Sequence, residues 1–389
     1  MGKTKQFSLV GMIHLVAALS AFAGEAASQR TTQPVQQADL FVGGKGGYHT
    51  YRIPALIVTS KGALLAFCEG RKTSRNDDGD IDLMLRRSTD GGKTWSDQTV
   101  VYEEGGTATI TIGNPCPIVD EATGAIWLPF CRNNRAVLIS QSTDDGLTWS
   151  KPVDITKEVK PAGWDWYATG PGVGIQLRVG PHKGRLIIPC DHGENFDGKP
   201  FKSSHVFYSD DHGKTWKLGG SLGPHTNECQ VVETRDGSLL LNMRNHFGRD
   251  GMAEKGGKRA LATSHDGGVT WSDVRFDEAL IEPVCQASLI RYRDADAPGK
   301  PILLFSNPAD RKQRINATVR SSEDDGQTWP AARSLHAGPS CYSSLAALPD
   351  GSIGCLYERG EKQFSEKITF ARFTLEWLTA ANATSNSGS

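Results

Sequence analysis

The sequence has no excess of charge of either sign and no run of basic residues. Its 43 Lys and Arg nearly balance its 44 Asp and Glu, which gives a formal net charge of -1. Nucleic acids and anionic membrane surfaces are bound by clusters of positive charge, so this balance argues against both kinds of partner. Positive charge that matters for function must therefore be concentrated locally.

The chain also lacks the cysteine and histidine spacings of a zinc site. None of its eight cysteines forms a Cys-x-x-Cys pair or lies in a His/Cys cluster. We therefore predict no metal and no other cofactor. Most of the cysteines lie inside apolar segments that read as strands, which favours buried free thiols over a disulfide framework.

Only one long apolar run occurs, from about Phe7 to Ala23, and it follows Lys3 and Lys5. This combination predicts a signal peptide over residues 1–23. The alternative is an uncleaved membrane anchor, but polar residues interrupt the run and no second apolar span follows. We expect a secreted or periplasmic protein without stable membrane insertion of the mature chain. Residues 24–37 are expected to be a linker and residues 379–389 a flexible tail.

The most regular feature is an eight-residue signature, Ser-x-Asp-x-Gly-x-Thr-Trp, which occurs five times. The copies begin at Ser88, Ser142, Ser209, Ser264 and Ser322. Their spacing of roughly 50 to 70 residues indicates a repeated structural unit. The Asp can bind turn amides, the Gly permits a rare backbone conformation, and the Trp can pack over the hairpin. The alternative is a calcium loop, but the signatures have no glutamate at the twelfth position that such a loop requires.

Apolar runs and glycine-containing turns surround each signature in the order of a four-stranded unit. Six such units predict an all-β fold, a six-bladed β-propeller with four antiparallel strands per blade, over residues 38–378. The last unit has no signature. We expect its missing strand to come from the segment around residues 40–42, which would close the ring without exposed edges.

Strand direction predicts which side chains can meet. In an antiparallel blade, the start of strand one and the loop between strands two and three lie on one face, and the signatures lie on the other. A single arginine at such a position would be a solvated loop charge. Eight polar groups at convergent positions predict one site: Arg52, Arg71, Asp77, Glu228, Arg244, Arg314, Tyr342 and Glu358. Trp164, Trp166, Tyr167 and His192 could form its rim, or could equally be ordinary loop packing.

Tyr51-Arg52-Ile53-Pro54, followed by the repeated signature known as the Asp box or BNR repeat, resembles the sialidases, also called neuraminidases. The resemblance extends from about Tyr51 to Glu358. It implies a six-bladed propeller that acts as an exo-α-sialidase, cleaving terminal sialic acids from glycans with retention of configuration. The implied partners are sialylated glycoproteins, glycolipids and oligosaccharides, and we expect a monomer.

The same resemblance implies roles for the convergent residues. Arg52, Arg244 and Arg314 match a triad of arginines, and planar guanidinium groups suit the substrate's carboxylate. Glu358 looks like the carboxylate that orients the first arginine. Arg71 resembles the arginine that helps to line the amide pocket.

Tyr342 matches the family's nucleophile and Glu228 its base. A neutral phenol avoids the repulsion that a carboxylate nucleophile would meet at a sugar acid, and nearby guanidiniums are expected to favour its ionised form. Asp77 matches the acid/base by its distance from Arg71, with Asp78 in reserve. Two alternatives stay open: a trans-sialidase or related ulosonic-acid glycosidase, and, less favoured, a non-catalytic propeller that binds sialosides.

Overall fold

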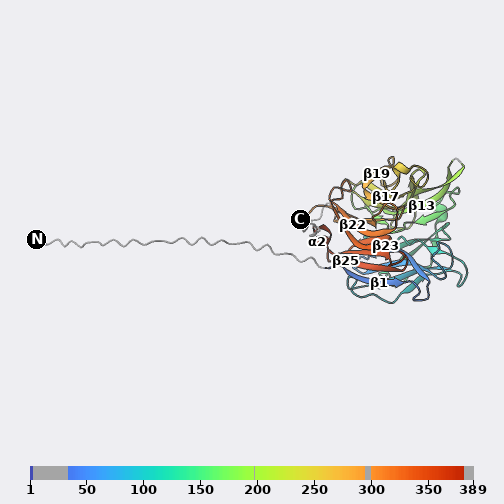
Figure 1. Ribbon diagram of the computed structural model, residues 1–389, viewed down its shortest axis with the longest axis horizontal. Helices are drawn as coiled ribbons and strands as arrows, with labels where there is room; N and C mark the ends of the chain where they lie inside the picture. Colours follow the sequence, from blue (N-terminus) through green and yellow to red (C-terminus); the bar gives the residue numbers. More distant parts are fainter. Residues whose placement is uncertain (3–33, 197, 294–298, 381–389) are drawn as a thin grey trace, which may run out of the picture. The chain divides into compact units, whose positions relative to one another are not determined.

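The chain folds almost entirely into β-strands (Figure 1). The computed structural model describes residues 1–2, 34–196, 198–293 and 299–380, and all of its named elements belong to one unit, residues 33–389. The strands pair antiparallel in five sheets that form a propeller. Three short helices accompany them: α1 (Thr156–Val159), the 3-10 helix η1 (Ala253–Lys255) and α2 (Leu375–Thr379).

Two of the sheets have four strands and two have five. The first four-stranded sheet consists of β2 (Thr50–Val58), β3 (Leu64–Arg71), β4 (Ile81–Ser88) and β5 (Thr99–Tyr102). The second consists of β16 (Thr226–Glu233), β17 (Leu239–Asn245), β18 (Lys258–Ser264) and β19 (Arg275–Ile281). One five-stranded sheet consists of β6 (Ile112–Gly113), β7 (Ile118–Val119), β8 (Ile126–Arg132), β9 (Ala136–Ser142) and β10 (Val153–Asp154). The other consists of β11 (Tyr167–Thr169), β12 (Ile175–Gln176), β13 (Leu186–Phe196), β14 (Lys199–Ser209) and β15 (Lys217–Ser221).

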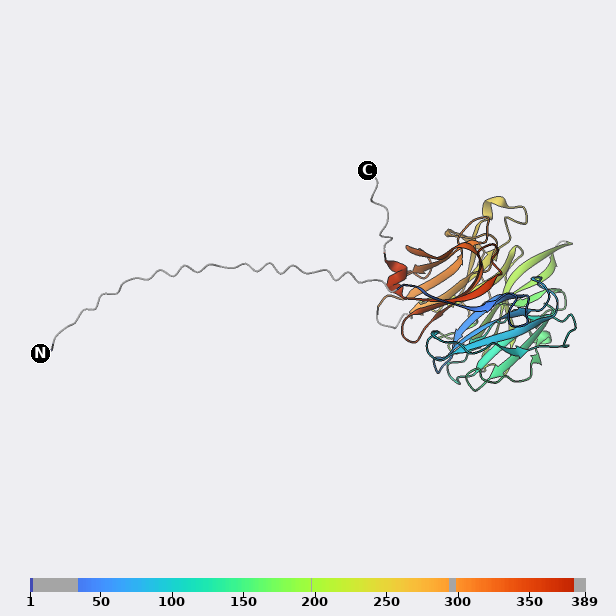
Figure 2. The same cartoon turned by 60° about the horizontal axis from the view of Figure 1, so that its bottom comes forward.

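The fifth sheet has seven strands and contains both ends of the folded unit. In spatial order it consists of β1 (Gln36–Val42), β25 (Lys367–Phe373), β24 (Ile353–Arg359), β23 (Ala331–Ala347), β22 (Ile315–Ser322), β21 (Ile302–Pro308) and β20 (Ser288–Arg293). The pairing of β1 with β25 confirms the strand predicted around residues 40–42 (Figures 1 and 2). Pairing of the two chain ends removes two edges that could recruit another strand.

The prediction of a six-bladed propeller with four strands in every blade is wrong. The strands form five sheets, and only two of these have four strands. The reason lies in β23, which is 17 residues long. Its first part pairs with β22 and its second part with β24, so strands that the sequence assigned to two blades share one sheet. A division into six units requires a new strand to begin in this region, but the chain passes through Cys341 without ending β23.

The five signatures are structural turns, as the sequence indicated. In the copy at residues 142–149, the Ser142 hydroxyl accepts a hydrogen bond from the Gly146 amide at 2.9 Å, and the Asp144 carboxylate binds the Thr148 hydroxyl and amide. These bonds, led by the one from the Thr148 hydroxyl, lower the pKa of Asp144 to about 2. The Trp149 ring packs edge-on against Phe67 of the neighbouring first sheet, with 5.7 Å between centroids. The signature therefore joins adjacent sheets.

The predicted domain limits differ slightly from the folded unit. Strand β1 begins at Gln36, inside the segment predicted as a linker, and α2 ends at Thr379. The predicted signal peptide, most of the linker and most of the tail lie outside the described residues. None of the helices in the described part of the chain has the length and apolar character needed to cross a membrane.

All eight cysteines are buried and free, which confirms the prediction from their apolar surroundings. They pack in the interior, as small apolar side chains do.

Candidate functional site

The eight convergent residues predicted from the sequence lie together. Five of them line a cavity of about 380 Å³: Arg71, Asp77, Glu228, Arg244 and Tyr342. The other three, Arg52, Arg314 and Glu358, surround the backbone and ring of Tyr342. They come from strands far apart in sequence, namely β2, β3, β16, β17, β23 and β24, with Asp77 following β3 and Arg314 preceding β22. None of the signature residues lines this cavity.

Tyr342 is the centre of the site. Its hydroxyl donates a short hydrogen bond to Glu228, and Arg244 donates from Nη1 to the same hydroxyl at 3.2 Å and to Glu228 at 2.8 Å. Burial and the charge of Glu228 raise the pKa of Tyr342, although Arg244 and Arg314 act in the opposite direction. Arg244 and Arg314 thus favour the ionised phenol, as expected, but burial and Glu228 outweigh them. The tyrosine is neutral, with its proton directed at a carboxylate.

Three guanidinium groups surround this one phenol. The Arg52 Cζ lies 5.0 Å from the ring centroid of Tyr342 and the Arg314 Cζ lies 6.0 Å from it, while Arg244 bonds its hydroxyl. The Arg314 guanidinium donates to the Cys341 sulfur at 3.3 Å and to the Val284 carbonyl at 3.1 Å, and neither partner is a carboxylate. Positive charge is thus concentrated locally in a chain of nearly zero net charge. Such a cluster suits a small anion.

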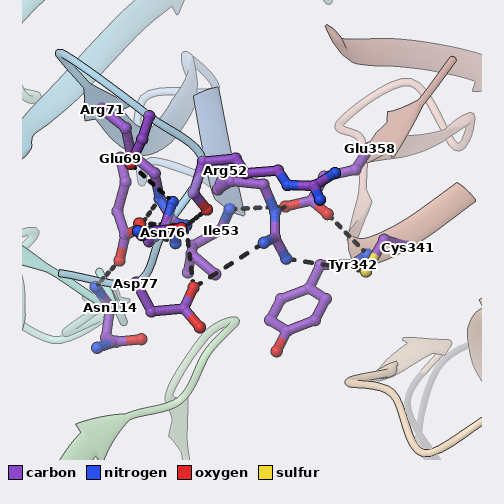
Figure 3. A network of polar contacts seen from close by, with 12 residues as sticks. Arg52, Ile53, Glu69, Arg71, Asn76, Asp77, Asn114, Cys341, Tyr342 and Glu358 are labelled. Carbon is purple, nitrogen blue, oxygen red and sulfur yellow. Dashed lines mark hydrogen bonds and ion pairs between the residues drawn. The ribbon is translucent and has the colours of Figure 1, made fainter. Parts of the chain in front are cut away.

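Glu358 holds Arg52 and the backbone of Tyr342 in place (Figure 3). Its side chain is fully buried, and one carboxylate oxygen accepts from Arg52 Nε and from the Ile53 amide, each at 2.8 Å. The other oxygen accepts from the Tyr342 amide at 3.3 Å. Burial lowers the pKa of Arg52, but the charge of Glu358, together with Cys341, Tyr342 and the hydrogen bond to Glu358, outweighs burial and the pKa rises. Arg52 is therefore a fixed positive charge.

The backbone is strained where it presents these groups. Ile53, between Arg52 and Pro54, has φ = 62°, and Val284, whose carbonyl binds Arg314, has φ = 55°. Left-handed backbone is costly for β-branched residues and persists only where surrounding contacts enforce it. At Ile53 the enforcing contact is the Glu358 carboxylate, and the β2–β3 register shifts between Arg52 and Ala55. This bulge places Arg52 over Tyr342.

Arg71 positions Asp77. The Arg71 side chain is 2% exposed, and its guanidinium bonds Glu69 and the carbonyls of Arg75 and Asn76. Its Nη1 also lies 2.9 Å from the Asp77 carboxylate (Figure 3). By contrast, the Asp77 side chain is 73% exposed and lies 4.0 Å from Arg52. Asp77 is thus a carboxylate at the cavity surface, held by a buried arginine, whereas Asp78 does not line the cavity.

Several residues of the site were not predicted from the sequence. Glu69 is buried and accepts two hydrogen bonds from Arg71. The sequence could have indicated this residue, because residues two apart on a strand share a face. Phe364 lies over both Arg52 and Arg314, with Cζ-to-centroid distances of 5.3 and 5.6 Å. Asp191 lines the cavity from β13. Neither of these last two carried a motif.

The predicted rim is right only in part. Trp166 lines the cavity. Tyr167 and His192 are fully buried, and Trp164 stacks on His192 with 3.3 Å between ring centroids. Trp164, which is partly buried, thus packs against Tyr167 and His192, which is the ordinary interpretation that the sequence also allowed. In the described part of the chain, no cluster of three or more His, Cys, Asp or Glu could hold a metal ion.

Asp191 makes the stability of the folded protein depend on pH. Burial, and then the charge of Glu228, raise its pKa from 3.8 to about 7; Lys202 and Arg244 oppose this. The folded state therefore binds a proton that the unfolded chain has lost, so the stabilising contribution is complete below pH 4 and disappears as pH rises through 7. We expect the melting temperature of wild type to fall, relative to Asp191→Asn, between pH 4 and 7. If the melting temperatures of the two proteins changed with pH in parallel over this range, this expectation would be wrong.

Comparison with known proteins agrees with this arrangement. Residues 62–355 match the family of BNR repeat-like domains. The chain is 40% identical over 365 residues to the sialidase of Micromonospora viridifaciens, covering 88% of this chain and 54% of that protein. It is 32% identical to the exo-alpha-sialidase of Aspergillus fumigatus, covering 85% of this chain and 86% of that one. A solved structure, the Hadza microbial sialidase Hz136, superposes with a TM-score of 0.77 at 31% identity, covering 88% of this chain and 69% of that one.

The relatives differ in length. The chain spans only about half of the Micromonospora protein and 60% of a Bacteroides fragilis sialidase that is 35% identical. It spans most of the fungal relative.

Proposed function

This chain belongs to the sialidase family, and from that membership we propose that it is an exo-α-sialidase, which hydrolyses terminal sialic acids from glycoproteins, glycolipids and oligosaccharides. The observation that carries the proposal is the meeting of Arg52, Arg244 and Arg314 around the buried phenol of Tyr342. A sialic acid has its carboxylate on the anomeric carbon. A substrate bound by its carboxylate would therefore present that carbon to Tyr342.

The first step is attack by the phenol oxygen of Tyr342 on the anomeric carbon. Glu228, already the acceptor of the phenol's hydrogen bond, takes the proton as the new carbon–oxygen bond forms. The raised pKa of Tyr342 keeps the nucleophile neutral while the substrate's anion enters, and the base removes the proton only during attack. The approach therefore avoids repulsion between two anions.

Asp77 supplies the proton that the leaving group needs. Its exposed carboxyl lies at the cavity surface, near enough to Arg52 to meet a glycosidic oxygen on the bound sugar. When the bond to that oxygen breaks, Asp77 protonates it; the same carboxylate then takes a proton from the water that cleaves the tyrosyl-sugar bond. Two displacements at one carbon give net retention of configuration. Tyr342 and Glu228 return to their starting states.

A fluorogenic aryl α-sialoside tests the activity directly. We expect release of the aryl alcohol, with the sugar appearing first as its α-anomer in proton NMR spectra recorded within the first minutes. Initial formation of the β-anomer would exclude retention. If the wild type releases nothing from aryl sialosides or from sialyl-lactose at any pH between 4 and 8, the proposed activity is wrong. Sialylated product in reactions supplied with an acceptor such as lactose would instead identify a transferase.

The rest of the proposal concerns the export and the oligomeric state of the protein. We propose export through the N-terminal segment, cleavage near residue 23 and action as a monomer. N-terminal sequencing of the exported protein and its mass in solution test these points.

A further inference from the structure

Two of the eight cysteines differ from the others, because their thiols contact each other beside the arginine cluster. The Sγ atoms of Cys285 and Cys341 are 3.5 Å apart, and the two residues are 1% and 2% exposed. Among the described residues, no hydrogen bond joins any other two cysteines. A disulfide holds its sulfurs about 2.05 Å apart, so each sulfur of this pair would have to move by less than about 1 Å.

The guanidinium of Arg314 holds together the same two segments as the thiol pair. It donates to the Cys341 sulfur at 3.3 Å and to the carbonyl of Val284, the residue before Cys285, at 3.1 Å. The Nη2 of Arg52 also lies 3.8 Å from the Cys341 sulfur (Figure 3). A change at this sulfur therefore affects two of the three arginines that surround the phenol.

The backbone at both cysteines lies outside the sheet ladders. Cys341 and Tyr342 form a bulge of β23, between Ser340 and Ser343, which are both paired with β24. Cys285 lies between β19 and β20. A small movement of either sulfur therefore breaks no rung of a sheet. Movement of Cys341 does shift the next residue, the proposed nucleophile Tyr342.

The surroundings of Cys285 favour its oxidation. Burial raises the pKa of this thiol, but the hydrogen bond from Cys341 and the charges of Arg314 and Arg244 outweigh burial and lower the pKa. The thiolate is the form that reacts with peroxides, and nearby positive charge increases its fraction. Hydrogen peroxide is nearly as small as water, and residues 311–313 are exposed, so local opening of this loop admits it.

We propose that Cys285 and Cys341 form a redox-sensitive modification site, at which hydrogen peroxide joins the two sulfurs in a disulfide and thereby inactivates the enzyme. The Cys285 thiolate attacks one peroxide oxygen and breaks the O–O bond, which gives, with one proton, a sulfenic acid and water. The Cys341 thiol then attacks the sulfenic sulfur. The S–S bond forms, and the hydroxyl leaves with the thiol proton as a second water. Two electrons pass from the thiols to the peroxide.

The disulfide acts on catalysis through its neighbours. Closing the bond changes the contact between the Cys341 sulfur and Arg314, and it shifts Tyr342 relative to the arginines. A displacement of about 1 Å at a catalytic group can cost about 10²-fold in rate. The loss of activity rests on the proposed function, whereas formation of the disulfide does not.

The test oxidises the wild type with hydrogen peroxide and maps its peptides by mass spectrometry without reduction. We expect a cross-link between the peptides that contain Cys285 and Cys341. The kcat/KM for an aryl α-sialoside should fall by about 10- to 100-fold and return with dithiothreitol. This recovery excludes methionine oxidation, which a dithiol does not reverse. The melting temperature should not fall, because a disulfide constrains the unfolded chain.

The variants are compared by the ratio of their activities after and before peroxide. Cys285→Ser cannot form the bond and should keep its activity after peroxide; Cys285→Ala serves if the serine variant does not fold. Cys131→Ser is the matched control. Cys131 is also fully buried, and a serine there keeps the hydroxyl of Thr169 as a partner. This variant should lose activity as the wild type does.

Three results would overturn the modification site. They are a peroxide-treated wild type with all eight thiols free, a cross-link that leaves kcat/KM unchanged, and a reversible loss of activity that persists in Cys285→Ser. If the reduced wild type turns over no sialoside, the proposed function fails instead. The peptide map then still decides on the disulfide, since a cross-link supports it and its absence overturns it.

Discussion

Tyr342→Phe is expected to lower the turnover of an aryl α-sialoside by at least about 10³-fold, because it removes the atom that forms the covalent bond and the proton that Glu228 takes. The binding of substrate should change little. Arg52 and Arg314 contact the ring of Tyr342 rather than its hydroxyl, and a phenylalanine ring keeps both contacts. Initial rates at saturating substrate measure the loss in kcat, and titration with a non-hydrolysable sialic-acid analogue measures binding.

Tyr357→Phe provides a matched control. Tyr357 lies in the adjacent strand β24, is 1% exposed, and its hydroxyl has no hydrogen-bond partner in the described structure. Removal of that hydroxyl should leave kcat and KM unchanged. A Tyr342→Phe variant with kcat within tenfold of wild type, in a preparation free of other sialidases, would exclude the tyrosine as nucleophile.

How far the sequence predicts this molecule depends on whether a feature is local. The four-stranded unit predicted around the first signature corresponds to the observed sheet of β2, β3, β4 and β5. Alternation, turn residues and the signature are contained within a few residues, so the sequence specifies them directly. The pairing of β1 with β25 was also predictable, because the last repeat lacked one strand.

The arrangement of sheets was less predictable. Whether the chain ends one strand and begins another near Cys341 depends on how β22 and β24 pair with it. The dipeptide Gly338-Pro339, which is typical of a turn, lies inside β23. The sequence therefore predicts six units of four strands, whereas β23 continues through the boundary and belongs to a sheet of seven strands.

The site shows the same division. The convergent arginines, Tyr342 and the acidic residues were found because strand direction places them on one face, and because their local motifs resemble a known family. Asp191 and Phe364 follow no motif, and their roles arise from side chains of other sheets: Asn227 beside Asp191, and Arg52 beneath Phe364. Residues that gain their properties from tertiary neighbours are identified only once those neighbours are placed.

Asp77→Ala should separate the two halves of the proposed reaction. For sialyl-lactose, whose leaving hydroxyl is a poor leaving group, loss of the acid is expected to lower kcat/KM by about 10²- to 10⁴-fold. For an aryl sialoside, kcat/KM should change far less, because an acidic phenol departs without protonation. Its kcat should still fall, since Asp77 also activates the water that releases the sugar from Tyr342. Added azide, which attacks without a base, should restore that kcat and yield a glycosyl azide.

Asp78→Ala decides between the two neighbouring carboxylates. Asp78 does not line the cavity, whereas Asp77 does and is held there by Arg71. Asp78→Ala should therefore match wild type on both substrates and show no response to azide. If Asp78→Ala instead showed the leaving-group dependence and Asp77→Ala did not, the acid/base role would pass to Asp78. The ion pair with Arg71 would then serve only to fold the loop after β3.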